Sequence, residues 1–325
     1  MKDVALLNGE IVGMVDARVS ILDRANLFGD GLYEVVRCYS GRLYKLDTHI
    51  RRLLAAARKL GIRHDHTHEQ LTSWANRLAD DSGVAEGEMY MQLSRGPAVR
   101  THYFPDPASA QPTIFMTLRP VRPIPPEART DGTAVITCPD MRHGWCHLKT
   151  LNLLANCLAK EKAHRHGAWE GLMLRGLGAA VQGCGPGGVA RAPLDVEDFC
   201  AGEGELAAAS PGDDCPGWVS EGASANLFIV GEGAVATPPV VNILPGVTRG
   251  IALELAATAG FEACEKPVSA RALLMAQEVF LTSTVGEIMP VVRVDGHSVG
   301  EGAPGPITRR LEQMYEERYR AELGL

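Results

Sequence analysis

Hydrophobic and polar side chains alternate along residues 4–22, which is the period of a half-buried β-strand. Asn8-Gly9 interrupts the alternation and predicts a tight hairpin turn, because both residue types tolerate the positive φ angles that such a turn requires. Ser40-Gly41 marks a second hairpin. The chain is therefore predicted to begin as antiparallel β-sheet.

From Asp47 the apolar residues follow helical spacing. One predicted helix ends at Gly61 and has the inward positions Leu53, Leu54, Ala57 and Leu60. A second predicted helix has the inward positions Leu71, Trp74 and Leu78. Helices and strands thus share the first part of the chain.

Strand-like runs at Met89–Leu93 and Thr113–Leu118 close this first region. The following stretch, Arg119–Pro126, is rich in proline, which favours an extended and semi-rigid connector. The chain is therefore predicted to comprise a small N-terminal α/β domain over 1–118, a linker over 119–127 and a larger C-terminal domain over 128–325.

The second domain also mixes strands with helices. Its predicted strands are Ala134–Cys138, Gly171–Leu174, Leu227–Val230, Val279–Ser283 and Val291–Val294, the last turned by Asp295-Gly296. The second and third of these are interpreted as the arms of one long hairpin. Helices are predicted at Val247–Ala259 and Ile307–Ala321. Because strands and helices do not alternate regularly, the predicted fold class is mixed α/β (α+β) in two domains and not a doubly wound sheet.

Residues 176–217 are rich in Gly, Ala, Pro and acidic residues. Such a composition does not form a core, so we expect an inserted surface loop in which Asp195–Phe199 forms one short helical turn against the body of the protein. Gly176-Leu177-Gly178 follows a strand but lacks the third small residue and the helix of a dinucleotide-binding loop. A zinc site is disfavoured because the three cysteines of the segment are neither closely paired nor near a histidine within it: Cys184, Cys200 and Cys215.

Lys149 stands directly before a predicted helix, in which apolar residues recur from Thr150 at Leu151, Leu154, Ala155 and Leu158. This spacing places Lys149 in the first turn, where the helix dipole disfavours a positive charge. Such a position favours the neutral, nucleophilic amine of a Schiff-base lysine. From the residues alone, Lys149 can instead be an ordinary solvated lysine on the protein surface.

The stretch Lys149–Leu154 closely resembles the lysine segment of the class IV pyridoxal-phosphate-dependent aminotransferases, most of all the D-amino-acid aminotransferases. Further stretches agree with the family in the same order along the chain: Phe28–Glu34, Arg100–His102, Ser220–Asn226 and Leu244–Arg249. The resemblance spans nearly all the chain except about residues 176–217. It implies a two-domain class IV aminotransferase-like fold and a homodimer.

The resemblance also implies a cofactor, pyridoxal 5′-phosphate, and the residues that hold it. Lys149 would form the Schiff base and then carry the proton, and Glu221 would keep the ring nitrogen protonated. The phosphate would be bound by Arg52, Val247, Thr248, Ser283 and Thr284. From the residues alone, Glu221 can equally be a surface glutamate and Thr248 a helix cap, and the choice of Arg52 over the adjacent Arg51 rests on the resemblance.

Tyr33, Arg100 and His102 match the side chains that hold the substrate α-carboxylate in the D-amino-acid branch of the family. Arg100 and His102 are two residues apart, so on an extended segment both face the same side and can reach one anion. Branched-chain and aminodeoxychorismate members differ at this segment, which makes it the main specificity signal. A surface Arg-His pair is the alternative.

The 325 residues are 46% hydrophobic and 22% charged, enough for two domains with full cores. A net charge of −7 without a basic stripe argues against nucleic acid or a membrane surface as partner. Neither a membrane-spanning run nor a signal peptide is recognisable, so a cytoplasmic location is expected. The eight cysteines are too sparse for a disulfide scaffold, and no bound metal is expected.

The sequence thus predicts a D-amino-acid aminotransferase that works by ping-pong half-reactions, for example with D-alanine as donor and 2-oxoglutarate as acceptor. The open alternatives within the family are a branched-chain L-amino-acid aminotransferase, an amine transaminase and an aminodeoxychorismate lyase. A coenzyme-binding protein without activity is another, because the inserted segment lies beside Glu221. The preferred side chain, the acceptor and a role of the segment as a lid stay open.

Overall fold

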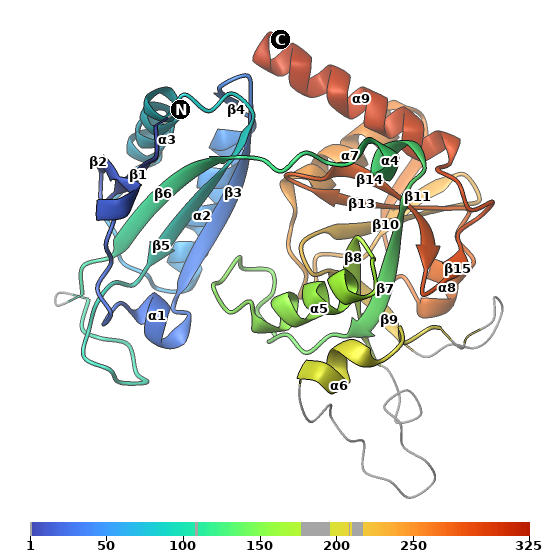
Figure 1. The fold of residues 1–325 in the computed structure, drawn as a ribbon, viewed down its shortest axis with the longest axis horizontal. Coiled ribbons are helices and arrows are strands. Elements are labelled where there is room, and N and C mark those ends of the chain that lie inside the picture. Colours follow the sequence, from blue (N-terminus) through green and yellow to red (C-terminus); the bar gives the residue numbers. More distant parts are fainter. Residues whose placement is uncertain (1, 108–109, 177–195, 208, 210–216) are drawn as a thin grey trace, which may run out of the picture. The chain divides into compact units, whose positions relative to one another are not determined.

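The computed structural model describes residues 2–107, 110–176, 196–207, 209 and 217–325 (Figure 1). The chain divides into two compact units. Unit 1 contains the residues up to Pro123 together with Leu148–Asn152 and Tyr319–Leu325, and unit 2 contains Ile124–His147 and Leu153–Arg318. The domain limits 1–118, 119–127 and 128–325 stay a prediction, and they leave out the two later segments of unit 1.

Unit 1 is built on an antiparallel sheet that has, among the described residues, the order β2-β1-β6-β5-β3-β4. Its strands are β1 (Val4–Leu7), β2 (Glu10–Gly13), β3 (Gly31–Tyr39), β4 (Arg42–Leu43), β5 (Gly87–Ser94) and β6 (Thr113–Pro120). Both hairpin predictions are confirmed, since Asn8 and Gly9 have φ angles of 50° and 93°, and Ser40 and Gly41 of 47° and 79°.

The strand pattern of residues 4–22 ends earlier than expected, because β2 stops at Gly13 and the short helix η1 (Met14–Asp16) follows. Helix α1 (Arg24–Phe28) comes next and ends at Gly29, which has the left-handed φ of 64°. A Cβ at Gly29 would lie 2.7 Å from the Asn152 Oδ1 atom, so glycine is needed there for space as well as for φ.

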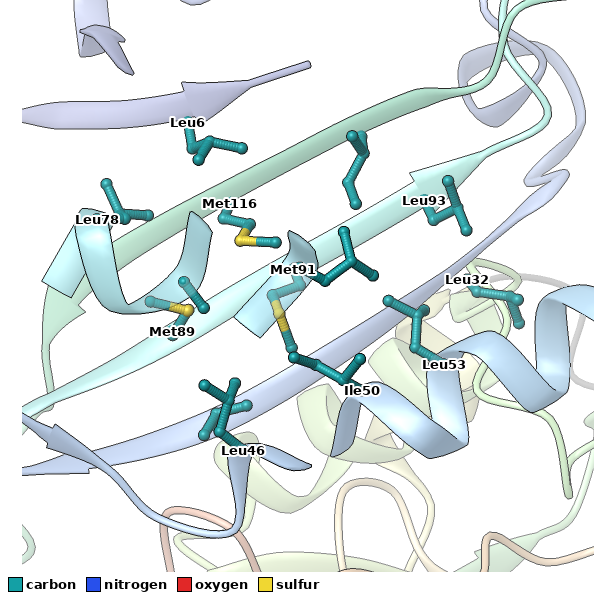
Figure 2. Close-up of a cluster of buried hydrophobic side chains, with 14 of the residues drawn as sticks. Leu6, Leu32, Leu46, Ile50, Leu53, Leu78, Met89, Met91, Leu93 and Met116 are labelled. Carbon is teal, nitrogen blue, oxygen red and sulfur yellow. The ribbon is translucent and has the colours of Figure 1, made fainter. Parts of the chain in front are cut away.

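Two longer helices cover one face of the sheet of unit 1, α2 (Leu46–Lys59) and α3 (His68–Ser82). Side chains from the strands and from both helices point toward one another in this core: Leu6, Leu32, Leu46, Ile50, Leu53, Leu78, Met89, Met91, Leu93 and Met116 (Figure 2). The predicted inward positions of both helices are confirmed as buried or half-buried. Burial of a leucine such as Leu53 contributes about 1.5–3 kcal/mol to the stability of this unit.

Unit 2 contains a larger mixed sheet, whose order among the described residues is β12-β11-β10-β13-β14-β7-β8-β9, with β15 paired to β14. Its strands are β7 (Thr133–Pro139), β8 (Glu170–Arg175), β9 (Trp218–Gly222), β10 (Asn226–Gly231), β11 (Ala234–Thr237), β12 (Glu262–Glu265), β13 (Glu278–Ser283), β14 (Glu287–Val294) and β15 (His297–Ser298). Only residues 223–225 connect β9 at the sheet edge to β10, so the sheet must curl to bring these strands close.

The helices of unit 2 are α4 (Pro126–Thr130), α5 (Leu154–Arg165), α6 (Val196–Ala201), α7 (Val247–Thr258), α8 (Ala270–Leu274) and α9 (Pro306–Leu323). The predictions of helices at Val247–Ala259 and Ile307–Ala321 are confirmed by α7 and α9. The end of α9, from Tyr319, is counted with unit 1, where the Tyr319 and Tyr39 rings stack with centroids 4.1 Å apart.

The interpretation of Gly171–Leu174 and Leu227–Val230 as one long hairpin is wrong. These segments form β8 and β10, and β8 pairs with β7 and β9 whereas β10 pairs with β11 and β13. The true partner β9 escaped recognition because its sequence, Trp-Val-Ser-Glu-Gly, carries two polar residues that the structure buries. Sequence patterns detect a strand by its apolar residues, so a strand with buried polar groups is missed.

The described part of the predicted insertion packs partly against unit 2, as expected for its helical turn. In residues 196–207, Phe199, Cys200 and Leu206 are buried in the clusters of unit 2. The buried Lys162 donates to the Glu203 carbonyl at 2.9 Å, and the Leu206 N–H donates to the Asp295 carboxylate at 2.9 Å. The predicted helical turn corresponds to α6. Most of the Gly176-Leu177-Gly178 stretch, Cys184 and Cys215 lie outside the described residues.

The mixed fold class is confirmed by both sheets, one antiparallel and one with antiparallel and parallel pairs. In the part of the chain that the structure describes, no helix is both long and apolar enough to cross a membrane.

Candidate active site

The segment around Lys149 is extended and hydrogen-bonded to β3 within unit 1. The Tyr33 N–H donates to the Lys149 carbonyl at 2.9 Å, and the Leu151 N–H donates to the Gly31 carbonyl at 3.1 Å. A β-bridge between Leu32 and Thr150 lies between these bonds. The backbone on both sides of Lys149 is therefore fixed by the sheet.

Helix α5 begins only at Leu154, so the prediction that Lys149 lies in its first turn is wrong. The backbone of residues 150–151 pairs with β3 and cannot also serve a helix. The predicted apolar stripe is wrong at Leu154, which is 75% exposed, whereas Ala155 and Leu158 are half-buried. A helix dipole acts over about one turn and does not explain chemistry at Lys149.

The amine of Lys149 lies over the ring of Tyr33, with its Nζ 4.1 Å from the ring centroid. Tyr33 stacks on Tyr90 with centroids 5.7 Å apart, and Tyr90 lies 5.8 Å from Phe115. The strand register places these aromatic side chains on the sheet face opposite the core. The structure thus brings together two of the predicted site residues, Lys149 and Tyr33.

Arg52 is held on the core side of β3 by Glu34, which also contacts His49. We call these three residues the Glu34 cluster. Arg52 donates to Glu34 from Nε at 2.7 Å and from Nη2 at 2.8 Å, and His49 Nδ1 lies 2.8 Å from the Glu34 carboxylate. The Arg52 side chain is 16% exposed, whereas Arg51 is 71% exposed and pairs with Asp47. Of the two adjacent arginines, only Arg52 is therefore fixed in place.

Burial and the neighbouring charges act in opposite directions on the pKa values of Glu34 and His49 in the Glu34 cluster. Burial raises the pKa of Glu34, yet the charge and hydrogen bonds of Arg52, with His49, bring it down to about 2. Burial lowers the pKa of His49 against the opposing effect of Glu34, and the charges of Arg52 and Lys149 lower it further. Glu34 therefore acts as a permanent acceptor for Arg52.

Arg100 and His102 lie in the loop after β5, and both are exposed. Both contact the Phe28 ring, with the Arg100 Cζ atom 5.3 Å and the His102 ring centroid 5.5 Å from its centroid. The two side chains therefore lie near one another, as their spacing predicts. Among the described residues, no hydrogen bond or ion pair joins either of them to Tyr33 or Lys149.

The loop that carries Arg100 and His102 is anchored by Asp30. This carboxylate accepts from Arg24 Nε at 2.6 Å and from Arg95 Nε at 2.9 Å. Arg24 also donates to the Thr101 carbonyl at 2.9 Å, and the Arg95 guanidinium lies 3.7 Å from the Phe104 ring centroid. The position of the loop thus depends on buried arginines and not on its own exposed residues.

Glu221 of β9 is buried in unit 2 and surrounded by hydrogen-bond donors. Asn226 Nδ2 donates to its Oε2 atom at 2.9 Å, the Leu244 N–H approaches both oxygens at 3.1 and 3.2 Å, and Arg142 Nη1 donates to Oε1. Because all three donors bind the carboxylate form, they favour the negative charge. The alternative of a surface glutamate is wrong.

Arg142 itself is held by Asp140, which lies at the end of β7. Its Nε and Nη2 atoms donate to the two Asp140 oxygens, each at 3.0 Å. Burial raises the pKa of Asp140, but Arg142, the Ser220 hydroxyl and Arg175 bring it down to about 2. Burial lowers the pKa of Arg142, and the charges of Asp140 and Glu221 with their hydrogen bonds more than reverse this. Asp140, Arg142 and Glu221 with Asn226 are called the Glu221 network below.

Helix α7 starts beside the Glu221 network. Its N-cap is Gly246, not Thr248, and neither a capping side chain nor an acidic residue of the first turn serves its first N–H groups. A Cβ at Gly246 would lie 2.1 Å from the Asn226 Oδ1 atom, so Asn226 requires glycine at this turn. Asn226 Nδ2 also donates to the Leu244 carbonyl at 3.0 Å. One amide thus connects Glu221 to the start of α7.

Ser283 and Thr284 lie where β13 ends and turns into β14. The Ser283 Oγ atom accepts from the Gly286 N–H at 2.9 Å, which leaves its own proton for donation. Val247 and Thr248 are the first residues of α7, and Thr248 is buried. All four belong to unit 2, as does Glu221, whereas Lys149, Arg52, Tyr33, Arg100 and His102 belong to unit 1.

Four supporting residues were not recognised in the sequence: Glu34, His49, Asp140 and Arg142. Glu34 stands beside Tyr33 in a recognised motif. Because side chains alternate along a strand, the sequence could have indicated that Glu34 lies on the buried face of β3. Arg142 lies in the irregular segment after β7, and no periodic pattern in the sequence relates it to Glu221. The described residues contain no cluster of His, Cys, Asp or Glu suited to a metal ion.

Residues 31–184 and 214–294 match the protein family described as amino-transferase class IV. The D-alanine aminotransferase of Bacillus licheniformis is 33% identical over 318 residues, which cover 98% of this chain and 97% of that protein. The D-alanine aminotransferase of Staphylococcus epidermidis strain RP62A is 34% identical over 312 residues, 96% of each chain. The interruption of the family match falls inside the 176–217 segment.

Among solved structures, the branched-chain amino acid aminotransferase of Escherichia coli is similar with a TM-score of 0.79 and 26% identity, over 98% of this chain and 95% of that chain. The branched-chain amino acid aminotransferase of Thermobaculum terrenum, solved in its PLP form, has a TM-score of 0.73 at 21% identity, over 98% of this chain and 94% of that chain. At 21% identity, the similarity to the Thermobaculum terrenum structure concerns the fold alone.

Proposed function

Because the chain belongs to the class IV aminotransferase family, we propose that it uses pyridoxal 5′-phosphate to transfer the amino group of a D-amino acid, such as D-alanine, to a 2-oxo acid such as 2-oxoglutarate. The observation that carries this proposal is the match with D-alanine aminotransferases over nearly the whole length of both chains. The solved structures named for branched-chain substrates share less sequence with this chain. Their names therefore weigh less in the choice of substrate.

The residues of unit 2 fit the ring nitrogen of this cofactor. A protonated ring nitrogen requires a fixed, negatively charged acceptor, and the ring then withdraws electrons from the bound substrate. Glu221 has this character, because Arg142, Asn226 and the Leu244 N–H hold it as a buried carboxylate. We propose that Glu221 keeps the ring nitrogen protonated.

The start of α7 and the end of β13 fit a phosphate. Uncapped N–H groups at a helix N-terminus attract an anion, and Ser283 retains a hydroxyl proton. No acidic residue in the first turn of α7 repels the negative charge. Val247, Thr248, Ser283 and Thr284 are thus proposed to bind the phosphate from unit 2. Arg52 is proposed to bind it from unit 1, where Glu34 holds the guanidinium in one orientation.

Lys149 is proposed to bind the coenzyme covalently through Nζ and, once displaced by the substrate amine, to carry a proton from the substrate α-carbon. The contact of Nζ with the Tyr33 ring supports a fixed direction for this flexible side chain. Tyr33, Arg100 and His102 are proposed to bind the substrate α-carboxylate. The shared contact of Arg100 and His102 with Phe28 supports a joint role of these two residues.

We further propose a homodimer in the cytoplasm, with no nucleic acid or membrane partner. The dimer rests on the family resemblance, and the absence of nucleic acid on the net charge of −7. Sedimentation of the purified protein at micromolar concentration tests the dimer, and fractionation of the source cells tests the location.

The function is tested with the purified, coenzyme-loaded protein and matched D- and L-amino acids, including alanine, glutamate and leucine, with 2-oxoglutarate or pyruvate as acceptor. The expected result is turnover of D-alanine and a shift of the visible coenzyme absorption on adding it. Turnover of L-leucine in its place would support the branched-chain alternative. Coenzyme binding without turnover of any donor would support a protein that has lost activity.

A further inference from the structure

We propose that Arg142 is a positioning residue for the coenzyme ring nitrogen, acting through Glu221. It holds the shared proton on the ring and away from the carboxylate. This inference rests on the proposed function, because it concerns the same cofactor. It adds a residue that neither the recognised motifs nor the local sequence pattern contain.

The geometry of Arg142 supports this role. Its side chain is 5% exposed, and its guanidinium is divided between two carboxylates. Nε and Nη2 bind Asp140 in a bidentate fork, which leaves Nη1 to donate to Glu221 Oε1. A planar fork fixed at one side has no freedom at the other, so Asp140 determines the direction in which Arg142 meets Glu221.

The balance of charge in the cluster shows what Arg142 does for Glu221. Asp140 and Glu221 are two buried negative charges, and Arg142 touches both of them. Arg175 provides a second positive charge, and its Nε atom contacts the Asp140 carboxylate at 2.7 Å. Without Arg142, both carboxylates would lose the cation that touches them, and a buried carboxylate that loses its cation takes up a proton more readily.

A proton between Glu221 and a ring nitrogen can lie on either partner. Arg142 donates directly to Glu221, so its positive charge stabilises the carboxylate more than it disfavours a protonated ring farther away. In a buried site with low dielectric screening, this difference decides the position of the proton. The pair of Glu221 with a protonated ring is therefore favoured over two neutral partners.

Arg142 differs in this respect from Asn226 and the Leu244 N–H, which also donate to Glu221. These donors are neutral and orient the carboxylate, while Arg142 alone among the three adds a full charge. A variant without Arg142 would keep two donors and so retain much of the Glu221 orientation. Removal of Arg142 should therefore change the protonation of the coenzyme ring more than the position of the ring.

The experiment measures the ¹⁵N chemical shift of coenzyme labelled at the ring nitrogen, bound to the protein at one fixed neutral pH. The shift distinguishes protonated from neutral rings, and a merely structural role of Arg142 would not move it. Coenzyme affinity is measured in parallel by equilibrium dialysis. The variants are Arg142→Gln, Glu221→Gln and the double variant, with Arg175→Gln as matched control, since it removes a positive charge from Asp140 but not from Glu221.

We expect a protonated ring in the unchanged protein and in Arg175→Gln, and a largely neutral ring in Arg142→Gln and Glu221→Gln. Coenzyme affinity in Arg142→Gln should fall by about 10- to 100-fold, as when a residue that orients a ligand-binding side chain is removed. In the Glu221→Gln background, Arg142→Gln should cause little further change, because it acts through Glu221. A protonated ring in Arg142→Gln, or an equal loss in Arg175→Gln, would overturn the proposal.

Arg142→Gln leaves an uncompensated buried charge and can fail to fold, which circular dichroism would reveal. In that case Asp140→Asn combined with Arg142→Gln removes both charges of the pair and keeps the cluster balanced. The proposal expects a neutral ring in this variant, and a protonated ring overturns it. If the unchanged protein binds no coenzyme, both proposals fail. If it binds coenzyme and the variants behave as expected but D-alanine is not converted, only the proposed function fails.

Discussion

The Glu34 cluster of unit 1 and the Glu221 network of unit 2 use the same chemical pair in opposite senses. In the first, a buried glutamate holds Arg52, which is the residue proposed to meet the ligand. In the second, a buried arginine holds Glu221, and the carboxylate is the residue proposed to meet the ligand. A buried ion pair is weak evidence for stability alone. The comparison suggests that each pair fixes the charge that its ligand requires, positive for a phosphate and negative for a protonated ring.

The largest effect is expected for Lys149→Ala, which removes the covalent link and the proton carrier that both regions would serve. Amino transfer from D-alanine should fall below detection, while coenzyme still binds through the proposed contacts of Glu221 and of the phosphate residues. Stopped-flow absorbance and equilibrium dialysis measure the two quantities. Turnover close to that of the unchanged protein would remove Lys149 from the centre of the mechanism.

Glu221→Gln should lower the rate of amino transfer by about 10²- to 10⁴-fold, the range for a group that stabilises developing charge. A neutral amide of nearly the same shape cannot hold the ring nitrogen protonated, but it keeps most contacts of the fold. Single-turnover kinetics with D-alanine measures the rate, and thermal unfolding checks the fold. Equal rates in both proteins would contradict the role assigned to the negative charge in unit 2.

Glu34→Gln should destabilise the protein by about 1–3 kcal/mol, because it removes the buried carboxylate that accepts two hydrogen bonds from the half-buried Arg52. Affinity for the coenzyme should fall as well, since the guanidinium loses its fixed orientation. Urea unfolding gives the free energy, and Arg51→Ala is the matched control. The exposed pair of Arg51 with Asp47 should contribute no more than about 1 kcal/mol. Similar effects of both changes would show that burial does not distinguish the two arginines.

The unfolding free energy should fall in acid through both regions. Glu34 and Asp140 have folded pKa values of about 2, below their ordinary values of 4.5 and 3.8. A depressed carboxyl pKa contributes stability that is present above the ordinary pKa and is lost as the pH falls toward the folded pKa. At 1.36 kcal/mol per pKa unit, the shifts correspond to roughly 3 kcal/mol for Glu34 and roughly 2 kcal/mol for Asp140 at neutral pH. Urea unfolding between pH 5 and pH 3 should therefore show a smaller slope in Glu34→Gln, and an unchanged slope would be evidence against the charged state of Glu34.

The smallest effect is expected for the replacement of Arg100 and His102, because no buried carboxylate in the described part of the chain holds either side chain. Arg100 and His102 are exposed, and neither forms an ion pair among the described residues. Replacing both with alanine should raise KM for D-alanine by about tenfold or more, the value of a lost charge-assisted hydrogen bond. Stability should change by less than about 0.5 kcal/mol, as for exposed substitutions. Unchanged KM would mean that the carboxylate binds elsewhere.

Local signals in the sequence predicted those elements whose cause is local. Asn8-Gly9 and Asp295-Gly296 adopt the positive φ angles of their turns, and the apolar spacing of α2 matches its buried face. The start of α5 could not be predicted in this way. The spacing after Thr150 fits a helix, but the bonds of Leu151 and Thr150 to a strand far away in sequence override it. Propensity is a weak prior against such tertiary pairing.

The residues of the candidate site also fall into those that the sequence could indicate and those that depend on the tertiary structure. Motif resemblance named Lys149, Glu221 and Arg52, and the structure adds the acidic or basic partner that holds the last two. Arg142 could not be found from the sequence, because its relation to Glu221 depends on β7 and β9 lying on either side of β8. The burial of Leu206 was missed because dispersed apolar residues in a Gly-rich segment carry no period.

The assembly of unit 1 from three stretches of chain has a consequence for folding during synthesis. Leu148 belongs to its core and Tyr319 stacks on Tyr39, although most of the unit is complete by Pro123. Contacts of such high sequence separation slow folding, because the intervening chain must be ordered first. As a ribosome adds about 5–20 residues per second, the early strands wait roughly 1–5 seconds for the stretch that carries Lys149 and roughly 10–40 seconds for Tyr319. During that interval the edge of β3 that later pairs with residues 149–151 exposes unpaired backbone N–H and C=O groups, which are prone to pair with another extended chain.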